Sequence, residues 1–336
     1  MKKKSNNILP QKEININAYD NTNIQKNNKK NIQEYRTVLS NPFTNELSFG
    51  LKRMTLHNFE EELEFTDEVK NTSMFFSVND FLGEQKIKDF NGFTDRQSKI
   101  WDFVLTKIGF LIKENSNNLS FYMAELIDFL GLSFQTKTIR NMSSDLAKIG
   151  SIRVKYEDIS RSNDPFIGFL FAVGGVGTNK NGELILTLGP WFEALKKRPE
   201  LHSYMFINNK TYTASKTNKK SDPYFIVARK IHEIFKNNLK RKKGKINKDG
   251  YYEITVSAQT FIKSLAWEEK ALKKDTKKYM TTLLDVFDRI QKDQNIIYDI
   301  IDSKIKGLNA YERFKETKFV FSCKDLEEAY KEIGYN

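Results

Sequence analysis

The side chains with the clearest chemistry in this chain form two clusters of lysine and arginine. The first lies in LKRKKGKINK, where no acid occurs before Asp249, and comprises Lys240, Arg241, Lys242, Lys243, Lys245 and Lys248. The second comprises Lys270, Lys273, Lys274, Lys277 and Lys278, at spacings of three and four that place them on one side of a helix. Grouped cationic side chains attract phosphate, so both clusters predict contacts with a polyanion.

Residues that would support catalysis do not form comparable groups. His57, His202 and His232 are isolated, and no His-x-His pair is present to hold a metal beside a nucleophilic tyrosine. From Gly177 to Gly182 the spacing is that of a Walker loop, but Glu183 stands where the lysine should be, so we interpret the segment as a hairpin connection. Motifs of hydrolases and zinc proteases are absent. We therefore expect no enzymatic activity, no metal site and no cofactor.

The composition agrees with a polyanionic partner. The 336 residues carry 55 Lys and Arg against 43 Asp and Glu, which gives a net charge of +12. The single cysteine, Cys323, excludes an internal disulfide framework, and no apolar run is long enough to cross a membrane. The length fits two domains. We expect a cytoplasmic protein that binds double-stranded DNA.

The second cluster belongs to a run of elements between Pro223 and Ile301. We expect a helix from Pro223 to Asn238, a strand from Tyr251 to Val256, a helix from Ser257 to Leu265, a helix from about Lys270 to Lys292 and a strand from Ile296 to Ile301. The long helix has an apolar stripe opposite its lysines, comprising Leu272, Met280, Leu283, Leu284, Phe287 and Ile290. This order is typical of the winged helix-turn-helix, whose second helix enters the DNA major groove.

A similar order precedes it in the chain. We expect helices starting at Thr94, from Met123 to Leu130 and from Gln135 to Lys148, followed by strands over Ser151 to Tyr156, Phe166 to Val173 and Glu183 to Leu188 that form a wing. The third helix packs through Ile139, Met142, Leu146 and Ile149. Its other face carries Lys137, Arg140, Asn141 and Ser144, which we predict to contact DNA.

The predicted fold class is therefore α+β, with two winged-helix (helix-turn-helix) domains in tandem and a disordered N-terminal tail. Residues 1–45, rich in Asn and Lys, form the tail. Residues 46–200 form the first domain with an N-terminal docking segment, 201–222 a polar linker, and 223–330 the second domain. The predicted DNA-binding residues are Lys137, Arg140, Asn141, Ser144, Lys240, Arg241, Lys242, Lys243, Lys245, Lys270, Lys273, Lys274, Lys277 and Lys278.

Several segments together resemble the plasmid replication initiator proteins that are built from two winged helices. They are SVNDFLGEQKI, TDRQSKIWDFVLTKI, QTKTIRNMSSDLAKI, and DPYFIVARKIHEIFKNN leading into ITVSAQTFIKSL, and the resemblance covers residues 74–325. It implies binding to repeats at a plasmid origin, opening of the adjacent AT-rich duplex, and recruitment of the host initiator and helicase. It also implies a homodimer formed through the first domain. The alternative is a winged-helix transcriptional or partition regulator, and a third candidate is an enzyme acting on nucleic acid.

Overall fold

The computed structural model describes most of the chain from residue 35 to residue 324. The described residues are 35–41, 44–45, 63–67, 72–78, 94–114, 116–150, 152–158, 166–174, 183–198, 202–214, 222–241, 245–301 and 307–324. Expectations that fall elsewhere, including those for Lys242 and Lys243, lie outside the described residues.

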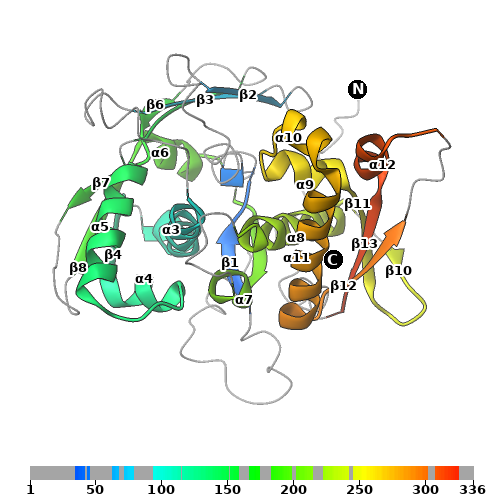
Figure 1. Ribbon diagram of the computed structural model, residues 1–336. Coiled ribbons are helices and arrows are strands. Elements are labelled where there is room, and N and C mark those ends of the chain that lie inside the picture. The colour runs from blue at the N-terminus through cyan, green and yellow to red at the C-terminus, as the bar shows by residue number, and fades with distance from the viewer. Residues whose placement is uncertain are drawn as a thin grey trace, which may run out of the picture.

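One order of elements occurs twice along the chain (Figure 1). The first unit comprises α3 (Asp95–Glu114), β4 (Asn118–Tyr122), α4 (Met123–Phe129), α5 (Thr136–Gly150), β7 (Phe171–Gly174) and β8 (Glu183–Leu188). The second unit comprises α8 (Tyr224–Lys240), β11 (Tyr252–Ser257), α9 (Ala258–Ser264), α11 (Thr276–Gln294), β12 (Ile297–Ile301) and β13 (Lys318–Cys323). The antiparallel orders β4-β8-β7 and β11-β13-β12 place the last strand between the other two in both units.

Additional elements are inserted into each unit. In the first, β5 (Ile152–Asp158) and β6 (Phe166–Phe169) join β2 (Leu63–Asp67) and β3 (Thr72–Val78) in a separate sheet of order β2-β3-β5-β6, and α6 (Pro190–Lys196) follows β8. In the second, β10 (Lys245–Ile246) extends the sheet beside β11, while α10 (Glu269–Lys274) and α12 (Ala310–Glu316) flank α11 and β12. The model is thus mixed α and β, with small antiparallel sheets.

The first sheet differs in one respect from the wing that we expected. Our expectation that Ser151 to Tyr156 forms a wing strand is wrong, because β5 pairs with β3. The predicted strand from Phe166 to Val173 is interrupted at Leu170, where the chain passes from one sheet to the other. The buried Leu170 donates its N–H to the carbonyl of Ile152, and its own carbonyl accepts from the indole Nε1 of Trp191 at 2.7 Å. The pairing of β7 with β8 confirms the hairpin around the glycine-rich connection.

A strand pair that we did not expect lies between the two units. β1 (Tyr35–Leu39) pairs antiparallel with β9 (Tyr204–Asn208), and α7 (Lys210–Thr213) follows. Thus β1 lies where we expected a disordered tail, and β9 where we expected a polar linker. The helices α3 and α8 pack against this pair, and Val38, Leu39, Met205 and Ile207 are fully buried. Burial between two helices removes the polar and apolar alternation by which a half-exposed strand is recognised.

The first helix of each unit begins where the sequence predicts. Thr94 precedes α3, and its hydroxyl accepts the backbone N–H of Gln97 at 3.2 Å while the Gln97 side chain accepts the N–H of Thr94 at 3.0 Å. This reciprocal pair satisfies two donors that the start of a helix leaves open. Ile100, Trp101, Val104 and Ile108 of α3 are then fully buried in the core.

Candidate nucleic-acid interface

In the first unit, α5 exposes the four side chains predicted to contact DNA. Lys137, Arg140 and Ser144 are exposed and Asn141 is half-buried, whereas Ile139, Met142, Leu146 and Ile149 pack inward as predicted. The buried carboxylate of Asp145 holds α5 against α3, because it accepts from Gln97 Nε2 at 2.9 Å and from Arg96 Nε at 2.5 Å. The packing of α5 therefore directs its polar face outward. DNA contact by these residues stays a prediction.

In the second unit, the predicted helix from Lys270 to Lys292 is not continuous. It breaks at Asp275, where the backbone has φ −144° and ψ 55°, and α10 and α11 lie on either side. The Asp275 carboxylate accepts the backbone N–H of Lys278 at 3.3 Å and so caps α11. A short acidic side chain stabilises a helix start better than a helix interior, which accounts for the break.

The break divides the second lysine cluster between two helices. Lys270, Lys273 and Lys274 lie on α10, whereas Lys277 and Lys278 lie in the first turn of α11. All five are exposed. Beyond this turn the exposed residues of α11 include Asp285 and Asp288, so only its N-terminal part suits a phosphate backbone. The inner stripe is as predicted: Leu272, Leu283, Phe287 and Ile290 are buried, and Met280 and Leu284 are packed against them.

Lys273 is already engaged within the protein. Its Nζ lies 2.7 Å from a carboxylate oxygen of Glu269 and 5.4 Å from the centre of the Tyr311 ring. The hydrogen bond with Glu269 raises the pKa of Lys273 and lowers that of Glu269. Lys315 Nζ lies 5.3 Å from the same ring centre. Lys273 thus links α10 to α12 and is the least suited of the five lysines to read a base.

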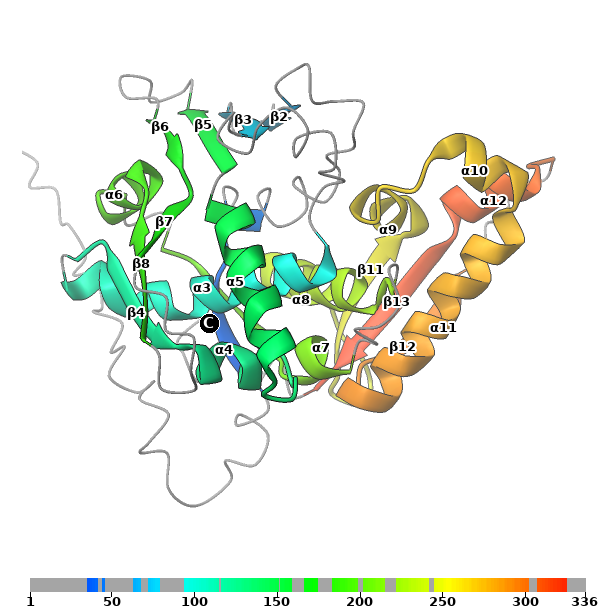
Figure 2. The ribbon, with the colours of Figure 1, turned by 60° about the vertical axis from the view of Figure 1, so that its left-hand side comes forward.

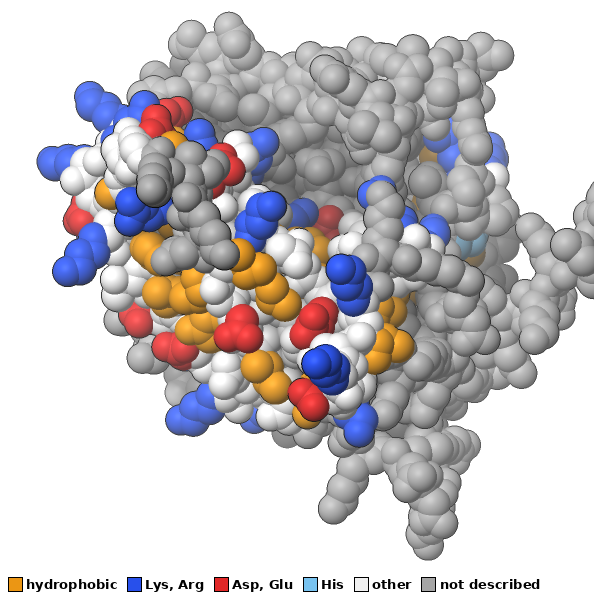
Figure 3. All heavy atoms as spheres, turned by 90° about the vertical axis from the view of Figure 1, so that its right-hand side faces the viewer, with side chains coloured by type: hydrophobic (Ala, Val, Ile, Leu, Met, Phe, Trp, Pro, Cys, Tyr) orange, Lys and Arg blue, Asp and Glu red, His pale blue; other side chains and the backbone are white. Residues whose placement is uncertain are grey.

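The sequence reasoning missed α12, which brings further cations to this end of the second unit. Asn309 caps it: the Asn309 side chain accepts the N–H of Glu312 at 2.9 Å, and the Glu312 side chain accepts the N–H of Asn309 at 3.4 Å. This Asn-x-x-Glu spacing was the available signal. We call the group of Lys270, Lys273, Lys274, Lys277, Lys278, Arg313 and Lys315 the cationic end. Lysine and arginine side chains gather there, at the upper left of Figure 3.

The described residues of the first basic cluster lie at the other end of the second unit. Lys240, Arg241 and Lys245 are exposed, and Lys245 in β10 lies opposite Glu253, next to the start of β11. The same end of the sheet is where α11 ends and β12 begins (Figure 1). The cationic end lies at the start of α11, and this helix of 19 residues is about 28 Å long. Lys240, Arg241 and Lys245 therefore lie at the opposite end of the second unit from the cationic end.

Metal ligation and membrane insertion are two further properties on which the described residues bear. Among them, no group of three His, Cys, Asp or Glu side chains could hold a metal ion. His202 contacts the carbonyl of Leu195 at 2.8 Å, and His232 is fully buried. No helix in the described ranges combines the length and the apolar character that a membrane span requires.

Comparison with known proteins gave matches among solved structures. No protein-family model and no curated protein sequence matches the chain. A crystal structure of domains 2 and 3 of RctB is similar at 9% sequence identity and a TM-score of 0.47, over 85% of this chain and 99% of that one. A second structure of RctB domains 2–3 is similar at 10% identity and a TM-score of 0.44, over 80% of this chain and 94% of that one.

Proposed function

We propose that this chain is a sequence-specific double-stranded DNA-binding protein with two winged-helix units, in which α5 and α11 enter the major groove. The observation that carries the proposal is the repeated arrangement: in both units the second long helix, α5 or α11, packs through one face and leaves a polar or cationic face in solvent. In α11 Lys277 and Lys278 lie in the N-terminal turn, which is the part of a recognition helix that contacts base edges.

We further propose that the DNA target is a set of repeats at a plasmid origin and that binding helps to open the adjacent AT-rich duplex. The sequence resemblance to plasmid replication initiators supports this function, and so does the repetition of one order of elements in two units of the chain. Such a protein acts by binding and has no turnover of its own. A homodimer through the first unit, the host initiator and the host helicase are the partners that this function implies.

The test begins with the purified chain and duplexes selected from a random library. We expect one monomer to protect a continuous site of about 20 base pairs, because two recognition helices in one chain would occupy neighbouring major-groove segments. If about six phosphates are contacted, affinity should fall by about 10³-fold between about 50 and 200 mM salt. Permanganate oxidation of thymines beside the site then reports duplex opening.

Other outcomes distinguish the competing functions. Protection confined to a two-fold palindrome bound by a dimer would support a transcriptional or partition regulator. Conversion of labelled DNA to product would reveal an enzyme. An affinity that does not change with salt would contradict the phosphate contacts on which the proposal depends.

A further inference from the structure

The C-terminal half of α11 is attached to the segment that connects the two units. Arg289 donates from Nη1 and Nη2 to the two carboxylate oxygens of Asp222, both at 2.9 Å, and from Nη2 to the carbonyl of Ala214 at 3.2 Å. Its guanidinium lies 4.6 Å from the centre of the Tyr224 ring. A bidentate ion pair with an additional stacking contact fixes direction as well as distance. Figures 1 and 2 both show α7 beside this end of α11.

The last residue of α11 makes a second attachment. Gln294 is 2% exposed, and its Nε2 donates to the hydroxyl of Thr211 at 3.1 Å and to the hydroxyl of Tyr224 at 3.0 Å. Its Oε1 lies 2.8 Å from Nε2 of His232. The amide thus uses both donors and its acceptor on α7 and α8. A buried amide with all these bonds made holds the end of the helix in one place.

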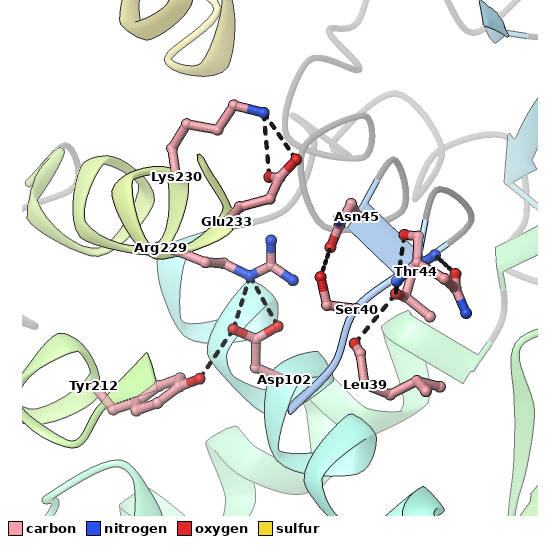
Figure 4. A network of polar contacts seen from close by, with 10 residues as sticks. Leu39, Ser40, Thr44, Asn45, Asp102, Tyr212, Arg229, Lys230 and Glu233 are labelled. Atoms are coloured by element: carbon pink, nitrogen blue, oxygen red, sulfur yellow. Dashed lines mark hydrogen bonds and ion pairs between the residues drawn. The ribbon is translucent and has the colours of Figure 1, made fainter. Parts of the chain in front are cut away.

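The same connecting segment is attached to the first unit. The Tyr212 hydroxyl donates to Asp102 of α3 at 3.2 Å, and Arg229 Nε of α8 donates to both oxygens of Asp102, at 3.0 and 2.9 Å. Figure 4 shows these three side chains, from three helices, pointing toward one another. All three are fully buried. Since α3 also holds α5 through Asp145, polar contacts link α11 to α7, α7 to α3 and α3 to α5.

We infer that Arg289 and Gln294 are positioning residues that fix the distance and angle between α11 and α5, so that the chain accepts one spacing between the two DNA segments it reads. The inference rests on the proposed function. Each added base pair moves the second segment by about 3.4 Å and turns it by about 35°. If a flexible linker joined the two units, they could move apart to match such a change in spacing. In this structure the contacts of Arg289 and Gln294 would have to break before α11 could move relative to α5.

The test compares duplexes that differ only in spacing. From the footprinted site, one duplex keeps the original spacing, one has two extra base pairs between the segments, and one contains the α11 segment alone. We expect the wild-type chain to bind the lengthened duplex at least tenfold more weakly than the original. Arg289→Ala should reduce this difference to threefold or less and leave affinity for the single segment unchanged. Lys292→Ala, an exposed position on the same helix, should keep the wild-type difference.

Gln294→Ala provides a second variant, and circular dichroism checks that it folds. If Gln294→Ala is unfolded, the result for Arg289→Ala alone decides whether the inference holds. A wild-type chain that binds both spacings equally would overturn the inference and leave DNA binding intact. An Arg289→Ala chain that keeps the wild-type difference would also overturn it. Failure of the wild-type chain to bind any duplex would instead refute the proposed function.

Discussion

Acidification should destabilise the fold through His232. This side chain is fully buried on α8, beside Gln294 and with its ring centre 6.1 Å from that of Tyr35. Burial lowers the pKa of His232 from its ordinary value of 6.5 to about 4, and the hydrogen bond with Gln294 opposes this only in part. The imidazole is therefore neutral in the folded protein at neutral pH. Protonating it would place a charge in the core between the two units.

The sign and size of the effect follow from linkage. Below pH 6.5 the unfolded chain binds the proton that the folded chain excludes, so the free energy of unfolding falls as the pH drops toward 4 and no further below it. At 1.36 kcal/mol per pKa unit, the difference between 6.5 and 4 corresponds to about 3 kcal/mol, of which about 2 kcal/mol is lost by pH 5.

Urea unfolding measured at several pH values, with wild type and His232→Gln, isolates this contribution. Carboxylates titrate in both proteins, so the difference between the two curves reports His232 alone. We expect wild type to lose about 2 kcal/mol more than the variant between about pH 7 and pH 5. Parallel curves for wild type and His232→Gln would refute the reasoning.

Three further predictions concern stability and recognition. Asp102→Asn should lower the free energy of unfolding in urea by about 3 to 5 kcal/mol, because it removes the carboxylate that forms the buried ion pair with Arg229. Lys107→Ala breaks a partly exposed pair and should cost about 1 kcal/mol or less. In competition binding, Lys274→Ala or Lys277→Ala should lower the affinity for cognate DNA relative to that for scrambled DNA by about tenfold or more. Replacing Lys240 and Arg241 by Ala should weaken binding to cognate and to scrambled DNA about equally. If the ratio of the two affinities is unchanged in both helix variants, recognition lies elsewhere. Gly189→Ala should abolish the folded circular dichroism spectrum, because the new Cβ would lie 1.8 Å from the Phe169 carbonyl oxygen, whereas Gly174→Ala, with its nearest atom at 3.7 Å, should be tolerated.

Most helices of both units could be predicted from the sequence, because their apolar residues recur at helical spacing and their ends carry recognisable residues. The start of α3 after Thr94 and of α8 after Pro223 are examples. The break at Asp275 was missed because lysines continue at helical spacing on both sides of it, so periodicity gave no sign of two helices. Only the capping role of the Asp275 side chain separates them, and that role depends on the local backbone.

The contacts between the units could not be predicted. Arg289 and Asp222 are 67 positions apart, and each is one of many charged residues that the sequence would allow to pair. The same holds for Asp102 and Arg229, at 127 positions. Local patterns indicate which face of a helix is buried, but they do not indicate which distant helix covers it. The exposed faces of α5 and α11 could therefore be predicted from the sequence, whereas the contacts that hold those faces in place could not.

The strand β1 also has a consequence for how the chain is made. Arg36 of β1 donates to the side chain of Asn209, which lies 173 positions later in the chain. At about 5 to 20 residues per second, the ribosome therefore needs about 9 to 35 s to synthesise the residues between them, which include the partner strand β9. The buried ammonium of Lys236, which donates to the carbonyl of Ser40, is made later still. During synthesis Val38 and Leu39 therefore remain without the strand that covers them. The first unit has time to fold before the region between the units closes, and nascent chains are most exposed to aggregation and to chaperones during that interval.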